Sequence, residues 1–167
     1  GLKSTYSLEG GANWTPVMAD TTNTPDRGYS VSVDLFDGDA YVAYLDKSGS
    51  SPALCFVYST DDGWEQPMVV DPSCLDGDTS LVVTDTGVHI CYHDDGDDLT
   101  VVSTGIDDLI NWNETRVDTT GSVGEYSAAA TGSGERIYIV YSDATNGQMK
   151  SATYEDTWST GTVSSDQ

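Results

Sequence analysis

Several features of this chain recur at intervals of just under 50 residues. Its four tryptophans, Trp14, Trp64, Trp112 and Trp158, are separated by 50, 48 and 46 residues. A second marker is a Tyr at the end of an alternating apolar run, followed two residues later by an Asp. It occurs as Tyr44 with Asp46, Tyr92 with Asp94, and Tyr141 with Asp143. A fixed period of this length indicates that one structural unit is repeated along the chain.

Each repeat contains four strand-sized segments separated by turn-forming residues. In the first complete repeat they cover about residues 30–33, 40–44, 54–58 and 64–70. No stretch shows the 3.6-residue apolar period of a helix, so we expect an all-β fold. Four short antiparallel strands in 40 to 50 residues is the size of a β-propeller blade. We predict about three and a half blades with 14 strands: a half blade at 1–20 and blades at 21–73, 74–121 and 122–167.

The turn before the fourth strand carries residues of a known motif. Residues 7–14 resemble the Asp-box, S-x-D-x-G-x-x-W, and its four motif positions hold Ser7, Glu9, Gly11 and Trp14. A second, shorter copy consists of Ser59, Asp61, Gly63 and Trp64. The chain is therefore similar to the Asp-box (BNR repeat) sialidase-like propellers, in which this motif forms that turn.

The resemblance has a testable implication for catalysis. A sialidase would need three arginines converging on the substrate carboxylate, a Tyr/Glu nucleophile pair and an Asp acid/base. The chain contains three arginines, Arg27, Arg116 and Arg136, and none lies in an F-R-I-P-like context. The Asp-boxes of that family lie away from the catalytic centre. We therefore predict no catalytic residue in this chain taken by itself.

The residues that repeat are interpreted as structural, because a catalytic residue is normally unique. Asp46, Asp94 and Asp143 are expected to cap the turn between the second and third strands of each blade. The tryptophans and tyrosines of the repeat are expected to pack blades together, although an exposed Trp could also stack on a sugar.

One acidic turn and two histidines could suggest a metal site. Asp94, Asp95, Asp97 and Asp98 form an oxygen-rich turn that could bind calcium or could simply be a solvated charge run. His89 and His93 are four residues apart in a strand, about 13 Å along it, which is too far to share one metal ion. No other cofactor is indicated.

Cysteines and glycosylation sequons leave alternatives open. Cys55, Cys74 and Cys91 allow at most one internal disulfide, and we interpret them as packing residues. Asn13 and Asn113 each begin an N-x-T sequon. Either could carry a glycan in an exported protein or could be an ordinary turn residue.

Charge limits the classes of partner. The chain has 28 acidic and 6 basic residues, for a net charge of −22. Nucleic acid is excluded as a partner because its phosphates would be repelled. Such a surface is typical of a halophile's protein, although Asp is also a favoured turn residue. No run of apolar residues is long enough to span a membrane.

Fourteen strands do not make a whole ring of four-stranded blades, so we expect further blades from a longer chain or a second subunit. The favoured function is a non-enzymatic module for adhesion or binding of a glycan or protein, or an architectural blade array, in an extracellular, cell-surface or virion-surface setting. The alternative is a sialidase-like glycoside hydrolase, or a lyase, completed by residues outside this chain.

Overall fold

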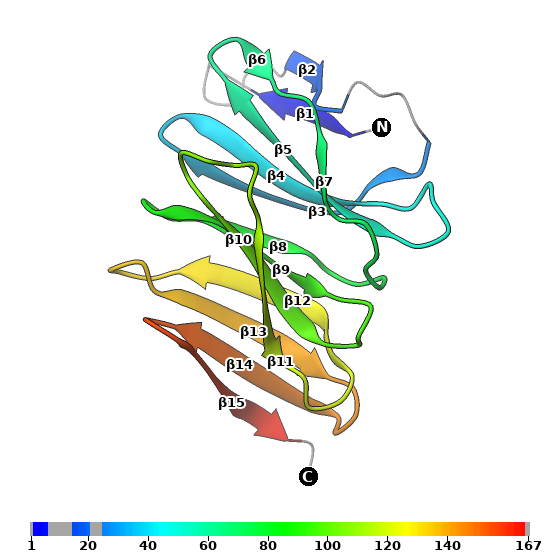
Figure 1. Ribbon diagram of the computed structural model, residues 1–167, viewed down its shortest axis with the longest axis vertical. Coiled ribbons are helices and arrows are strands. Elements are labelled where there is room, and N and C mark those ends of the chain that lie inside the picture. Colours follow the sequence, from blue (N-terminus) through cyan, green and yellow to red (C-terminus); the bar gives the residue numbers. More distant parts are fainter. Residues whose placement is uncertain (1, 7–14, 21–24, 166–167) are drawn as a thin grey trace.

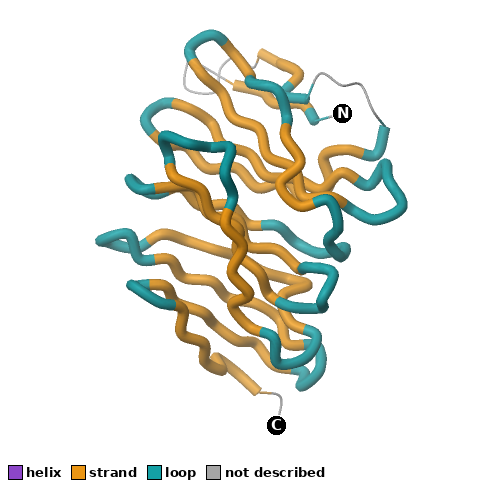
Figure 2. The backbone as a smooth tube through the Cα atoms, viewed as in Figure 1, coloured by secondary structure: helices purple, strands orange, loops and turns teal. Residues whose placement is uncertain are grey.

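The computed structural model describes residues 2–6, 15–20 and 25–165. Within these ranges the regular secondary structure consists entirely of β-strands (Figures 1 and 2), so the expected all-β class is confirmed. No described segment forms a helix that could cross a bilayer.

The strands form four open antiparallel sheets that follow one another in chain order. The first sheet holds β1 (Lys3–Tyr6) and β2 (Thr15–Met18). The second holds β3 (Arg27–Phe36), β4 (Asp39–Asp46), β5 (Ala53–Thr60), β6 (Gly63–Trp64) and β7 (Met68–Asp71). The third holds β8 (Ser80–Val83), β9 (Gly87–His93), β10 (Leu99–Gly105) and β11 (Asn113–Asp118). The fourth holds β12 (Val123–Thr131), β13 (Ile137–Asp143), β14 (Gln148–Tyr154) and β15 (Trp158–Ser165).

The sheets stack face to face, as Figure 1 shows from top to bottom. One apolar cluster lies at each of the three junctions between neighbouring sheets. As a result β4 and β9 are buried on both faces, as is typical of strands that lie between two packed layers. Phe56 is fully buried in the second junction, and burial of such a side chain contributes about 2–3 kcal/mol.

The tryptophans also lie at these junctions. Trp64, Trp112 and Trp158 pack against the first, second and third clusters respectively. Trp112 meets Phe56 of the preceding sheet edge to face, with ring centroids 5.1 Å apart. Trp14 lies outside the described residues.

The first strand of the third sheet has an edge that is capped by side chains from the second sheet. The backbone N–H groups of Thr79, which precedes β8, and of Leu81 and Val83 on β8 donate to side-chain oxygens of the second sheet. The acceptors are Ser30, Ser32 and Asp34, at 2.7, 2.9 and 2.9 Å. One sheet further on, the Ala129 N–H donates to Ser80 at 2.9 Å. Unpaired strand edges are otherwise exposed to adventitious pairing. The 49-residue spacing of these contacts therefore gives the sequence repeat a direct structural role.

The strand count differs from the expected 14 because one fourth strand is interrupted. The predicted segment 64–70 forms two short strands, β6 and β7, which both pair with β5. Pro67 lies between them and has no N–H to donate to a ladder, so continuous pairing is broken there.

The described Asp-box-like copy forms the expected tight turn between the third and fourth strands. Thr60 pairs with Gly63 across it, and Gly63 has a φ of 118°, which favours glycine. The Thr60 hydroxyl accepts from the Asp62 N–H at 3.3 Å. Asp61 is exposed at the tip and Ser59 donates to Asp39 at 3.4 Å. The other copy, with Ser7, Glu9 and Gly11, lies outside the described residues.

Replacing Ser32 with alanine is expected to leave the buried Leu81 N–H without its acceptor and to destabilise the protein by about 1 kcal/mol. Chemical denaturation monitored by tryptophan fluorescence would measure the change. Ser164→Ala, at an exposed position of β15, is the matched control. Equal stability of Ser32→Ala and the control would contradict the capping role.

Candidate functional site

A buried tyrosine joins each sheet to the sheet before it. Tyr44, Tyr92 and Tyr141 occupy equivalent positions on β4, β9 and β13 and are at most 2% exposed. Their hydroxyls donate to aspartate carboxylates of the preceding sheet. Each aspartate is either the last residue of that sheet's final strand or lies just after it. The acceptors are Asp20, Asp71 and Asp118, at 3.0, 2.7 and 2.7 Å. The sequence marks these aspartates as repeating, because each ends the run that follows a repeat tryptophan. Their role as acceptors of the tyrosine hydroxyls was not predicted.

A cation stabilises two of these three pairs. Arg27 Nη1 lies 3.0 Å from Asp20, and its Nε lies 2.8 Å from Asp46 without a well-aligned hydrogen bond. Lys150 forms an ion pair with Asp118 and lies 4.0 Å from Asp143. Each cation therefore bridges the aspartate of one sheet to the turn of the next.

The second junction is arranged differently. Among the described residues, Arg116 is the cation nearest to Asp94, the turn aspartate of the third sheet. Its Nε lies 3.4 Å from Asp94 and its Nη1 3.4 Å from Asp98. Arg116 belongs to the same sheet as these carboxylates and is half exposed. Its contribution is accordingly smaller than that of a buried cation.

Burial and hydrogen bonding fix the charge states at the junctions. Burial by itself would raise the pKa of Asp118, but hydrogen bonds from Lys150, Thr120 and Tyr141 outweigh it and hold the pKa at about 2. Burial, together with the neighbouring carboxylate, raises the pKa of Tyr141 well above its ordinary value. The tyrosine thus remains a neutral donor and the aspartate a charged acceptor.

The turn aspartates accept backbone hydrogen bonds. Asp46 accepts from the Ser48 N–H at 2.9 Å, and Asp143 from the Asn146 N–H at 2.9 Å. Asp94 accepts from the Gly96 and Asp98 N–H groups at 2.8 and 3.0 Å. All three carboxylates therefore bind the turn that follows their own strand.

The carboxylates of the acidic turn point to different partners. Asp94 and Asp98 contact Arg116, whereas Asp97 accepts from the Ser122 hydroxyl at 2.8 Å and lies 2.8 Å from His93 Nε2. Asp95 is exposed. Over the part of the chain that the structure describes, no group of three His, Cys, Asp or Glu side chains is placed to hold a metal ion.

The histidines lie in separate surroundings. Burial lowers the pKa of His89, whose Nδ1 lies 2.9 Å from the Ser103 hydroxyl. His93 has a buried Nδ1 with no partner and pairs through Nε2 with Asp97. Because Ser122 also contacts Asp97 rather than His93, these residues do not form a nucleophile, base and acid in series.

The cysteines are packing residues, and the second sequon lies at an exposed position. Cys55, Cys74 and Cys91 are free and buried. Burial raises their pKa values to about 11, 12 and 11, so the thiols stay protonated and weakly reactive. Asn113 is exposed at the start of β11, and Asn13 lies outside the described residues.

The three arginines do not converge on one site. Arg27 starts β3 beside the end of β4, while Arg136 precedes β13 at the opposite end of its sheet and contacts Glu155 at 2.5 Å. Arg116 lies on the last strand of the third sheet. Each arginine neutralises local carboxylates, so these side chains form no shared pocket for an anionic substrate.

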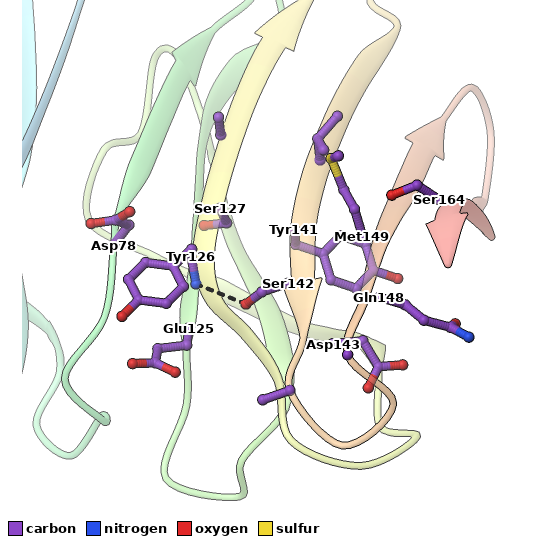
Figure 3. Close-up of a pocket in the computed structure, with 14 residues that line it drawn as sticks. Asp78, Glu125, Tyr126, Ser127, Tyr141, Ser142, Asp143, Gln148, Met149 and Ser164 are labelled. Carbon is purple, nitrogen blue, oxygen red and sulfur yellow. Dashed lines mark hydrogen bonds between the residues drawn. The ribbon is translucent and has the colours of Figure 1, made fainter. Parts of the chain in front are cut away.

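A pocket of about 660 Å³ lies on the outer face of the fourth sheet (Figure 3). Tyr126, Val140 and Met149 give it an apolar surface, and each is more than 40% exposed. Glu125 and Asp143 are among its polar lining residues. The Tyr126 N–H donates to the Ser142 hydroxyl at 3.1 Å, the dashed line in Figure 3.

Comparison with solved structures finds a similar fold in a sialidase. The chain superposes on Trypanosoma rangeli sialidase with a TM-score of 0.63 and 14% identity, covering 95% of this chain and 32% of the sialidase. The fold of this chain is sialidase-like. At this identity the likeness concerns the fold alone, and the chain spans about a third of that enzyme's length.

A glycosyl hydrolase from Bacteroides ovatus superposes with a TM-score of 0.48 and 14% identity, over 81% of this chain and 48% of that one. No protein-family model matches the chain, and no curated protein matches its sequence.

The lowered pKa of Asp118 predicts a loss of stability in acid. Its folded pKa of about 2 is below the ordinary value near 3.9, so its contribution is complete above about pH 4 and is lost towards pH 2. We expect Asp118→Asn to be destabilised by roughly 1–2 kcal/mol at pH 6, with a difference from wild type that shrinks as pH falls. Urea denaturation at several pH values measures this. Asp62→Asn, on an exposed turn, is the control, and a pH-independent difference would refute the assignment.

Proposed function

We propose that this chain is a non-enzymatic binding module built from propeller blades and displayed outside the cell or on a cell or virion surface. The observation that carries the proposal is the use of the repeated Tyr and Asp side chains, together with Arg27 and Lys150, in joining sheets and closing turns. Side chains committed to buried pairs are not available to act on a substrate. Recognition then falls to the exposed turns that the rigid sheets hold in place.

The proposed recognition surface is the end of the sheets that carries the β4–β5, β9–β10 and β13–β14 turns. Exposed side chains there include Ser50, Asp95 and Asn146, and Asp76 lies nearby on the connection into β8. Carboxylates, hydroxyls and amides of this kind exchange hydrogen bonds with sugar hydroxyls. A glycan is therefore the favoured ligand.

Binding to a glycan array by the protein, with no release of sugar, is the expected result. Asp95→Ala should weaken binding at least about fivefold, since it removes one charge-assisted hydrogen bond at that end. Asp62→Ala is the matched control, because it removes an exposed carboxylate from the opposite end of the sheets. Equal binding by both variants would place recognition elsewhere, and an empty array would count against a glycan ligand.

A glycoside hydrolase is the second candidate, supported by the likeness to a sialidase fold. In that case the catalytic groups must come from residues beyond those of this chain, because its arginines are separately engaged. Turnover of fluorogenic sialosides or other glycosides by the longest natural form of the protein would favour this candidate over the first.

A saline environment is proposed from the net charge of −22. Mutual repulsion among acidic side chains is screened as the Debye length falls from about 10 Å at 0.1 M salt to about 3 Å at 1 M. The melting temperature is therefore expected to rise with KCl concentration. Differential scanning fluorimetry measures it, and an equal concentration of sucrose separates screening from general exclusion. A melting temperature that stays flat or falls would contradict a halophilic origin.

A further inference from the structure

The two junctions on either side of the third sheet bury the same positions of the preceding sheet. Strand register aligns Ala43 on β4 with Cys91 on β9, and Leu54 on β5 with Leu99 on β10. All four side chains are at most 2% exposed. In each case the next sheet supplies the covering residues, including the tyrosine that reaches back to an aspartate.

The fourth sheet presents the same positions without a cover. Register places Val140 on β13 and Met149 on β14 in alignment with those buried residues, yet Val140 is 41% and Met149 43% exposed. Strand β13 accordingly alternates buried and exposed residues, whereas β4 and β9 are buried on both faces. Tyr138, two residues before Val140 on the same strand and 41% exposed, extends the apolar face.

The first strand of the second sheet shows the complementary feature. Val33 and Leu35 on β3 align with Leu81 and Val83 on β8. The β8 residues are 4% and 7% exposed, while the β3 residues are 60% and 70% exposed. The stack therefore has one unpaired outgoing face, on β13 and β14, and one unpaired incoming face, on β3.

We propose that the outgoing face, defined by Tyr138, Val140 and Met149, is an interface for one occupant, another four-stranded sheet of the same repeat. The argument is continuity with an established interface, because the aligned residues of the second and third sheets are covered by such a sheet. The proposal does not depend on what the molecule binds elsewhere. It assigns the pocket on this face to packing between blades, not to a small ligand.

A second copy of this chain fits less well as the occupant. Leu2 and Ala19 of the first sheet already pack on Val42, Tyr44 and Val57. Among the described residues, the incoming side of the second sheet is therefore exposed at β3 and covered at β4 and β5. An incoming copy would not offer a whole four-stranded sheet to the outgoing face.

The fourth sheet differs from the second and third in one contact that it can offer to the next sheet. Ser32 and Ser80 cap an amide of the next sheet, and the aligned residue of the fourth sheet is Ala128. Alanine has no acceptor in its side chain, so the first strand of the covering sheet must satisfy that edge amide in another way. The contact on this side is accordingly more apolar.

Thiol labelling tests the proposal directly. Val140→Cys is prepared both in this chain and in the longest natural form of the protein, and its reaction with a maleimide is followed by mass spectrometry. The introduced thiol is expected to react at least about tenfold more slowly in the longer form, because labelling there requires local opening. Val69→Cys, at an exposed position of β7 (54%), is the control and should react equally fast in both forms. The native thiols are all buried.

Equal labelling of Val140→Cys in the two forms would overturn the proposal. So would the finding that the natural protein has no form longer than this chain. Protection within this chain that grows with its concentration would overturn it in favour of self-association. Val140→Asp gives a second reading. It should lower the melting temperature of the longer form by about 5–10 °C and that of this chain by much less. Equal shifts would again refute the interface.

Discussion

Each sheet is fastened to the one before it by a buried tyrosine hydroxyl that donates to an aspartate carboxylate. The tyrosine belongs to the second strand of one sheet, and the aspartate to the end of the previous sheet. A carboxylate removed from water needs hydrogen-bond donors or a cation to compensate for its lost hydration. The pair therefore fixes how neighbouring sheets meet, and the apolar clusters fill the space that this geometry leaves.

The same constraint explains why residues that suggest chemistry are structural here. A tyrosine beside an aspartate, with an arginine or lysine in contact, could indicate an active site in isolation. In this chain the tyrosine–aspartate pair recurs at all three junctions with a buried tyrosine at each, and a cation joins the pair at two of them. The acidic turns follow the same rule, since their carboxylates accept backbone amides of the residues that follow. Function is therefore sought at exposed turns and uncovered faces.

The ends of the stack of sheets leave apolar residues exposed. A sheet buried on both faces needs two neighbours, and the fourth sheet has one covered face, where it packs on the third sheet. The apolar residues exposed on β13 and β14 match residues that are buried elsewhere in the molecule. Large exposed apolar patches mark interaction sites, and the repeat itself identifies what kind of surface fits this one.

The sequence by itself determined the strand content, the repeat length and the residues that recur, because apolar alternation and turn-forming residues are local signals. It predicted a continuous fourth strand at 64–70, but Pro67 divides it. The acceptors of the tyrosine hydroxyls were not assigned, since Asp71 and Tyr92 are 21 residues apart and meet only when sheets stack. Likewise, only the tertiary structure separated Arg27, Arg116 and Arg136, and only it distinguished Val140 from Cys91. Burial and pairing between sheets depend on how the sheets pack together, which no local pattern encodes.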